Sequence, residues 1–330
     1  AITFSSNAVL SYTNQAYTQA WGARSATSVS NTAANISFLI NGLDGNANTA
    51  TISTSGTVSI QPFASNFGSN VELWHNLSGA SNYLVGSNSL INTATYDVYP
   101  LGSVTASGPI EIYGRTLIWA NDKDLKTTGV GSRILLKAQG DIYIPDGSGT
   151  TDAGHTVLQT NLGDLVLWSD GDGSGAGGMT IGNYVQFVTD NGAKSKTATS
   201  GGGDIVLGGG ATADSNGFPA GYAQVGSTYN TDRGLQLQFS LGFFTGGGDL
   251  IWKGRGPTFG IALYHTSEIF TGTGRIDIDA VSTGTGGTYG FAFIDESWTG
   301  NNGPLTLVSH ATASPAIKIS HLHFKIGRAH

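Results

Sequence analysis

The chain of 330 residues has 50 glycines, no cysteine and a formal net charge of −7, and only 11% of its residues are charged. This acidic balance argues against nucleic-acid binding, which needs concentrated lysine and arginine. The lack of cysteine excludes disulfides and thiol chemistry. No stretch approaches the roughly 18 consecutive apolar residues of a spanning helix, so we expect no membrane span.

Residues 1–50 match no motif and form an unassigned lead-in, expected to be β. From residue 51 to 325 one phrase recurs: glycine, usually an acidic residue, then two aliphatic residues flanking one free position. It begins, in chain order, at Gly56, Gly108, Gly140, Gly163, Gly203, Gly248, Gly274 and Gly303. Alternate side chains of a strand face opposite sides, so each copy predicts one turn and one strand with two buried residues. Such units bury their faces by stacking, which predicts an all-β solenoid.

The spacing of the glycines sets the expected coil. Gly140 and Gly163 are 23 residues apart, and Gly248 and Gly274 are 26 apart. These values predict coils of roughly 20–30 residues. The separations of 40 residues from Gly163 to Gly203 and of 45 from there to Gly248 are interpreted as two coils each. The first residues after the glycines, Ile142, Leu165, Ile205, Leu250 and Ile276, are expected to form one buried column.

The aspartates after the glycines recur with the strand, at positions 141, 164, 204 and 249. A catalytic group is needed once, whereas a structural group is needed in every coil. We therefore expect these carboxylates to accept hydrogen bonds from backbone amides at the turns.

A short acidic loop at residues 170–175 begins like a calcium-binding loop. Asp170, Asp172 and Ser174 supply oxygen at alternate positions, but position twelve, where a glutamate is expected, is Ile181. A glycine-rich insertion is the favoured interpretation, and a looser calcium site is the alternative. We expect no other cofactor.

Outward-facing apolar residues suggest a binding surface. Tyr143, Val166, Val206 and Ile251 occupy the free position of the phrase, and Trp168 continues the same face. Stacking would place these five residues in one stripe. A contiguous exposed stripe is typical of a contact surface for a sugar chain or a partner strand. The favoured alternative is that residues 211–233 fold over the stripe and bury it.

One pair of carboxylates offers an enzymatic alternative. Asp277 and Asp279 flank Ile278 and would lie on one face, roughly 7 Å apart. Paired carboxylates hydrolyse glycans. Asp295 and Glu296, near Trp298, are a second such pair. We expect no enzymatic activity, because no cluster of lysine and arginine accompanies these carboxylates in the sequence.

The phrases in their order resemble a known family. The similarity is carried by the runs Thr57–Phe63, Gly108–Gly114, Ile134–Ile142, Leu158–Asp170 and Gly203–Gly210. Together they look like the filamentous-haemagglutinin-like repeat proteins, large secreted adhesins of Gram-negative bacterial surfaces. The resemblance covers about residues 50 to 310. It implies a right-handed parallel β-helix, an extracellular or outer-surface location, and a structural, adhesive function without catalysis.

The same resemblance implies the partners: surface glycans, host or neighbouring cell surfaces, and further coils of a longer chain. The last five residues, 326–330, resemble a translated sequencing adapter, so we expect them to be a non-native tail on a fragment. The alternative function is that of a polysaccharide-acting β-helix enzyme or a tailspike-like glycan-binding protein.

Overall fold

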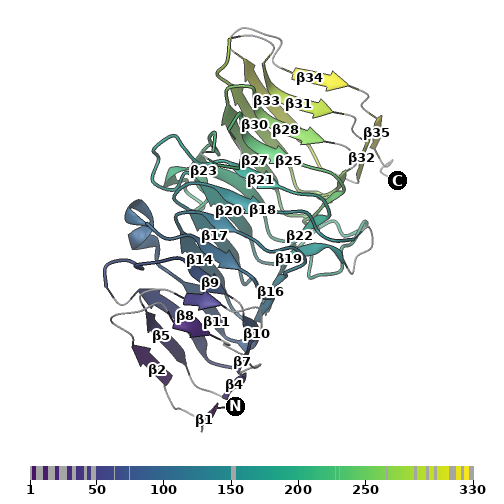
Figure 1. Cartoon of the computed structure of the whole chain (residues 1–330). Coiled ribbons are helices and arrows are strands. Elements are labelled where there is room, and N and C mark those ends of the chain that lie inside the picture. The colour runs from purple at the N-terminus through teal and green to yellow at the C-terminus, as the bar shows by residue number, and fades with distance from the viewer. Residues whose placement is uncertain are drawn as a thin grey trace.

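The structure is a computed structural model. It describes residues 2–4, 10–13, 19–21, 28–31, 35–40, 43–45, 50–62, 64–73, 75–149, 154–226, 228–229, 231–264, 267–285, 288–294, 297–300, 303–311, 317–320 and 323–326. Within these residues the chain is a parallel β-helix, in which three strands per coil stack along one axis from the N-terminus to the C-terminus (Figure 1). Three long parallel sheets result, which we call A, B and C.

Sheet A takes the first strand of each coil: β1 (Ile2–Phe4), β4 (Ser28–Asn31), β7 (Ala50–Thr54), β10 (His75–Ala80), β13 (Val104–Ala106), β16 (Leu125–Val130), β19 (Thr156–Asn161), β22 (Val185–Val188), β26 (Leu241–Phe244), β29 (Ser267–Phe270), β32 (Ser297–Gly300) and β35 (His323–Ile326).

Sheet B takes the second strand of each coil: β2 (Leu10–Thr13), β5 (Ile36–Ile40), β8 (Thr57–Pro62), β11 (Asn82–Val85), β14 (Ile110–Gly114), β17 (Ile134–Ala138), β20 (Leu165–Ser169), β23 (Ile205–Ala213), β27 (Leu250–Gly256), β30 (Ile276–Ser282) and β33 (Leu305–Ala311). A short strand, β24 (Pro219–Gly221), pairs antiparallel with β23.

Sheet C takes the third strand: β3 (Gln19–Trp21), β6 (Leu43–Gly45), β9 (Val71–Leu73), β12 (Val98–Pro100), β15 (Leu117–Ile118), β18 (Ile142–Ile144), β21 (Met179–Ile181), β25 (Arg233–Leu237), β28 (Phe259–Tyr264), β31 (Tyr289–Ile294) and β34 (Ile317–Ser320). A 3-10 helix, η1 (Asn88–Thr93), lies between β11 and β12. Strands of the lead-in β1–β6 continue all three sheets, and residues 327–330 of the expected tail lie outside the described residues.

The core is a continuous file of aliphatic and aromatic side chains inside the coils. Leu165 stacks on Ile205, Ile205 on Leu250, and Leu250 on Ile276 along sheet B, and each is at most 1% exposed. The prediction of this column is confirmed for these four residues. It is wrong for Ile142, which pairs with Leu117 and Met179 in sheet C. The phrase at Gly140 therefore marks a different corner of the coil.

Two long separations in the sequence are single coils, which corrects the interpretation as double coils. Residues 165 and 205, 40 apart, are direct neighbours in sheet B, as are residues 205 and 250, 45 apart. The additional length lies in connections between strands, including residues 170–178 between β20 and β21 and the hairpin that contains β24. Insertions are tolerated there because the stacked strands remain in register.

Candidate functional site

The apolar stripe predicted on the outer face is covered rather than open. Val166, Val206 and Ile251 are aligned across β20, β23 and β27 as expected, and Trp168 follows on β20. Val166 and Trp168 are 3% and 5% exposed, because Ile91 of η1 and Phe218 of the β23–β24 hairpin pack over this face. The alternative in which residues 211–233 bury the stripe is the one the structure supports.

Tyr143 does not belong to that stripe, which corrects the prediction of one continuous surface. It lies on β18 of sheet C, and its ring stacks on Tyr229 with centroids 4.4 Å apart and planes 9° apart. The two phrases that contain Tyr143 and Val166 begin at different corners, so their free positions face different sides of the solenoid.

The acidic loop at residues 170–175 is organised by its own hydrogen bonds. Asp170 Oδ1 accepts from Gly175 N at 2.9 Å, and Asp172 Oδ1 accepts from Ser174 N at 3.0 Å. Burial raises the pKa of Asp170 despite these donors. Within the described residues no cluster of three or more histidines, aspartates or glutamates is arranged to hold a metal ion. The calcium site remains a prediction.

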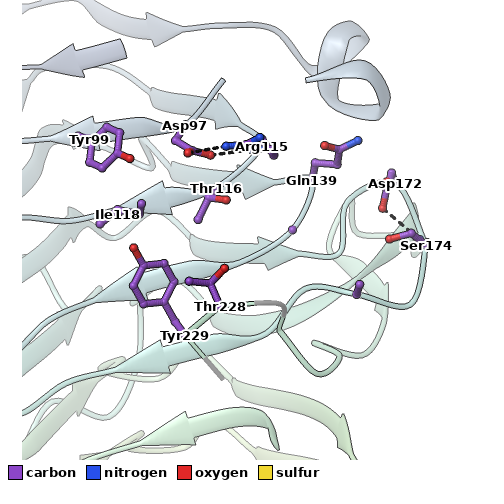
Figure 2. A pocket seen from close by; sticks show the side chains of 12 residues that line it. Asp97, Tyr99, Arg115, Thr116, Ile118, Gln139, Asp172, Ser174, Thr228 and Tyr229 are labelled. Carbon is purple, nitrogen blue, oxygen red and sulfur yellow. Dashed lines mark hydrogen bonds and ion pairs between the residues drawn. The ribbon is translucent and has the colours of Figure 1, made fainter. Parts of the chain in front are cut away.

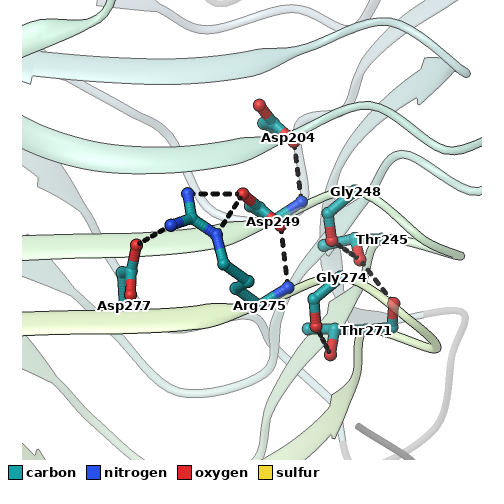
Figure 3. Close-up of polar contacts among 8 residues, drawn as sticks. All are labelled: Asp204, Thr245, Gly248, Asp249, Thr271, Gly274, Arg275 and Asp277. Atoms are coloured by element: carbon teal, nitrogen blue, oxygen red, sulfur yellow. Dashed lines mark hydrogen bonds and ion pairs between the residues drawn. The ribbon is translucent and has the colours of Figure 1, made fainter. Parts of the chain in front are cut away.

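Three of the repeated aspartates, at positions 164, 204 and 249, form a ladder along one corner, and Figure 3 shows its steps from Asp204 through Asp249 to Arg275. Asp164 Oδ1 accepts the backbone N–H of Asp204 at 3.0 Å, and Asp204 Oδ1 accepts that of Asp249 at 2.7 Å. Asp249 continues the ladder by accepting from Arg275 N and by binding both the Nε and Nη2 of its guanidinium. Desolvation raises the pKa of Asp204. The prediction that these carboxylates accept hydrogen bonds from backbone amides is confirmed, and the donors belong to the next coil.

A second corner element escaped the sequence analysis. The buried hydroxyls of Thr160, Thr245 and Thr271 donate to the carbonyls of Gly163, Gly248 and Gly274, each three residues later. These bonds occupy carbonyls that would otherwise be buried without a partner. The signal was present as a threonine three residues before three of the glycines.

A groove on the outer face of sheet C is the strongest candidate site (Figure 2). It encloses about 530 Å³ beside β12 and β15. It is lined by Asp97, Tyr99, Arg115, Thr116, Ile118, Gln139, Gly140, Asp172, Ser174, Ala176, Thr228 and Tyr229. The Tyr99 and Tyr229 side chains lie near one end with Ile118 between them, and Asp172 and Ser174 lie at the other. This volume falls in the range of small-ligand sites.

An ion pair borders the centre of the groove. Arg115 donates from Nε to Asp97 Oδ1 at 2.9 Å and from Nη2 to Asp97 Oδ2 at 2.7 Å. This two-bond geometry fixes both planar groups. The hydrogen bonds to Asp97 raise the pKa of Arg115. Asp97 is itself positioned by its backbone N–H, which donates to Asn70 Oδ1 at 3.0 Å.

The wall that carries Tyr229 is anchored to the solenoid from behind. Tyr229 stacks on Tyr143, and its carbonyl accepts from the Thr180 hydroxyl at 3.4 Å. Thr228 N donates to the buried carboxylate of Asp141 at 3.2 Å. Asp141 and Tyr143, which belong to the phrase that begins at Gly140, therefore hold in place residues 228–229, which are distant in sequence.

A smaller hollow on sheet B contains the predicted carboxylate pair. Asp277 and Asp279 on β30 line it with Lys253 and Arg275. The sequence predicts no cluster of lysine and arginine around these carboxylates, and the structure places two cationic side chains near them: Arg275 Nη1 lies 3.2 Å from Asp277 Oδ2, and Lys253 is opposite Asp279 in register. The Tyr222 hydroxyl donates to Asp279 Oδ2 at 2.8 Å, and burial followed by this bond raises the pKa of Tyr222 to about 12. Asp295 and Glu296 lie outside the described residues.

Comparisons with known proteins do not extend these observations. No protein-family model, no curated protein and no solved structure matches the chain. Among the residues that the structure describes, none of the helices has the length and apolar character needed to cross a bilayer.

Proposed function

We propose that this protein is a secreted or surface-displayed scaffold of the adhesin type, which contacts surface glycans through the sheet C groove and does not cleave them. The groove is the observation that carries the proposal. Tyr99, Tyr229 and Ile118 offer flat apolar surface to the nonpolar faces of sugar rings, and the adjacent Asp97–Arg115 pair offers an acceptor and donors to hydroxyls. Most residues that line the groove are polar, and the two tyrosines and Ile118 provide its apolar surface.

The groove is better suited to binding than to hydrolysis. A glycosidase needs two carboxyl groups on opposite sides of the scissile bond, one of them able to donate a proton. Both oxygens of the Asp97 side chain accept hydrogen bonds from Arg115, so this carboxyl group already has a structural partner. Asp172 lies toward the far end and accepts a hydrogen bond from its own loop.

The second candidate function is hydrolysis or lysis of a polysaccharide at the sheet B hollow. The observation in its favour is the outward pair Asp277 and Asp279 with Arg275 and Lys253 beside it. The observation against it is that both carboxylates already have partners in the fold: Arg275 for Asp277 and Tyr222 for Asp279.

The experiment measures binding and turnover together. The protein is incubated with a panel of immobilised and soluble polysaccharides, and retained protein, new reducing ends and unsaturated products are recorded. We expect binding without product, weakened at least tenfold by Tyr229→Ala. Phe239→Ala is the matched control, because Phe239 is 38% exposed against 36% for Tyr229 and does not line the groove.

Turnover that disappears in Asp277→Asn or Asp279→Asn would overturn the proposal in favour of the enzyme. Absence of both binding and turnover with every polysaccharide would overturn both candidate functions.

A further inference from the structure

The charges of the groove bear on which saccharides it accepts, an inference that rests on the proposed function. Its charged lining residues at neutral pH are Asp97, Arg115 and Asp172, so carboxylates outnumber guanidinium groups among the described lining residues. The whole chain is acidic as well, with a formal net charge of −7. A ligand that carries carboxylates would therefore be repelled by the negative charge of the groove and by the negative net charge of the whole protein.

Arg115 is the group that would attract an acidic ligand, and it is already engaged. Its side chain is 50% exposed, whereas that of Asp97 beneath it is 12% exposed. Two of its donors form the fork to Asp97, which is the geometry in which guanidinium recognises any carboxylate. An acidic sugar would have to compete with a carboxylate that the fold holds in place.

The field of Asp97 extends across the aromatic end of the groove. Burial raises the pKa of both Tyr99 and Tyr229, and the charge of Asp97 raises each further. Both hydroxyls therefore remain protonated at neutral pH and can donate to sugar oxygens. Figure 2 shows both hydroxyls directed toward Ile118, which lies between the two rings, and the Asp97–Arg115 pair beside Tyr99.

We infer that the groove selects neutral saccharides over those that carry carboxylates, and that Asp97 determines this specificity by occupying the guanidinium of Arg115. The neutral ligand would stack on Tyr229 and Ile118 and exchange hydrogen bonds with the tyrosine hydroxyls and the ion pair. Asp97 thus acts as an internal competitor for acidic ligands.

The test uses matched pairs of ligands: hexuronic-acid oligosaccharides of the gluco, manno and galacto series, and the same oligosaccharides after reduction of their carboxyl groups. Titration calorimetry with the full chain is expected to show that the wild-type protein binds at least one neutral member and binds its acidic counterpart at least tenfold more weakly. The affinity for the neutral member should change little between low and high salt, since no net charge is neutralised.

Asp97→Asn is the decisive variant, because it preserves shape but leaves Arg115 without a carboxylate. We expect its affinity for the acidic member to rise about tenfold, the effect of about one favourable charge contact, and to fall with added salt. Asp172→Asn, which removes a negative charge without releasing Arg115, is the control and should leave the preference for neutral ligands in place.

Arg115→Gln is a second test variant, and its result does not depend on whether Asp97→Asn folds. This variant should bind acidic ligands more weakly than the wild type does, since the substitution removes the only guanidinium among the described lining residues and leaves the side chain of Asp97 in place. Thermal melts of each variant establish that it is folded.

The failures of the two proposals can be distinguished. A wild-type protein that prefers the acidic members, or an Asp97→Asn variant with unchanged preference, overturns the inference and leaves glycan binding standing. A wild-type protein that binds neither member of any pair overturns the proposed function and the inference with it.

Discussion

His75 lies wholly inside the solenoid, where its ring is 2% exposed. Its Nε2 is 2.9 Å from the Tyr83 hydroxyl, and the two ring centroids are 5.7 Å apart. Burial lowers the pKa of His75 from 6.5 to about 4. The interior of a coil can therefore hold a polar pair, provided that the histidine stays neutral.

This burial predicts a pH-dependent stability. Between pH 6.5 and 4 the unfolded chain binds a proton at His75 and the native chain does not, so stability should fall as the pH falls through this window. The full effect is about 3 kcal/mol. Thermal unfolding of wild type and His75→Gln across this range should show a shallower decline in the variant.

Tyr83→Phe is the control for that prediction, since it removes the hydroxyl partner and keeps the buried imidazole. Its pH dependence should remain like that of the wild type. Asp170 and Asp204 have raised pKa values and act in the opposite direction at the acidic end. The difference between variants therefore isolates His75, and identical slopes for wild type and His75→Gln would contradict the assignment.

At the scale of elements, the β23–β24 hairpin is a cover for the outer face of sheet B. Its turn is closed by Asp214, which donates its N–H to Phe218 O and accepts from Phe218 N through Oδ1. The Trp168 indole reaches the hairpin by donating to Gly210 O at 2.6 Å. Lys137 Nζ lies 3.8 Å from the Trp168 ring centroid, and burial lowers the pKa of Lys137. The hairpin and η1 thus convert an apolar outer face into a second core.

Phe218→Ala should uncover that face without unfolding the solenoid. Loss of a buried phenyl ring costs roughly 3 kcal/mol. Here this loss lowers the free energy with which the hairpin packs on sheet B. We expect increased binding of the dye ANS with an unchanged far-ultraviolet circular dichroism spectrum. Val130→Ala is the control, because Val130 is 77% exposed and covers nothing. Equal dye binding by the two variants would show that the hairpin does not depend on Phe218.

The sequence was sufficient to predict the repeating element but not the corner at which each copy begins. The alternation of apolar residues in the phrase predicts a strand and the face of it that is buried. Leu165, Ile205 and Leu250 lie on the buried face, as this pattern predicts. Gly140 precedes a strand of sheet C, whereas Gly163 precedes a strand of sheet B. The alternation of side chains along a strand is the same in every sheet, so it cannot tell which of the three sheets the strand joins. The groove could not be predicted, because Asp97, Arg115 and Tyr229 come together only when the coils from β12 to β25 have stacked.

At the scale of the whole molecule, the stacking of coils predicts that a destabilising substitution affects only the coils near it. Each coil contacts its two neighbours, so stability is a sum of coil and interface contributions. Leu165→Asp would bury an unpaired charge at a residue with 0% exposure. Hydrogen exchange should accelerate in the neighbouring strands β17 and β23 and stay unchanged in β30.

Val130→Asp introduces the same charge at an exposed position of β16 and is the control for Leu165→Asp. It should alter exchange nowhere beyond its own strand. Uniform acceleration along the chain in Leu165→Asp would show instead that the solenoid unfolds as one cooperative unit.

Because the coils differ in length, each coil that detaches when the two ends are pulled apart would release a different length of chain. The coil from Ile110 to Ile134 contains 24 residues and that from Ile205 to Leu250 contains 45. Peeled off the stack, these would release at most about 80 Å and 150 Å of chain. A molecule tethered at a surface would then yield in steps of unequal size, and the longest steps would come from the coils whose insertions carry the hairpin and the wall of the groove.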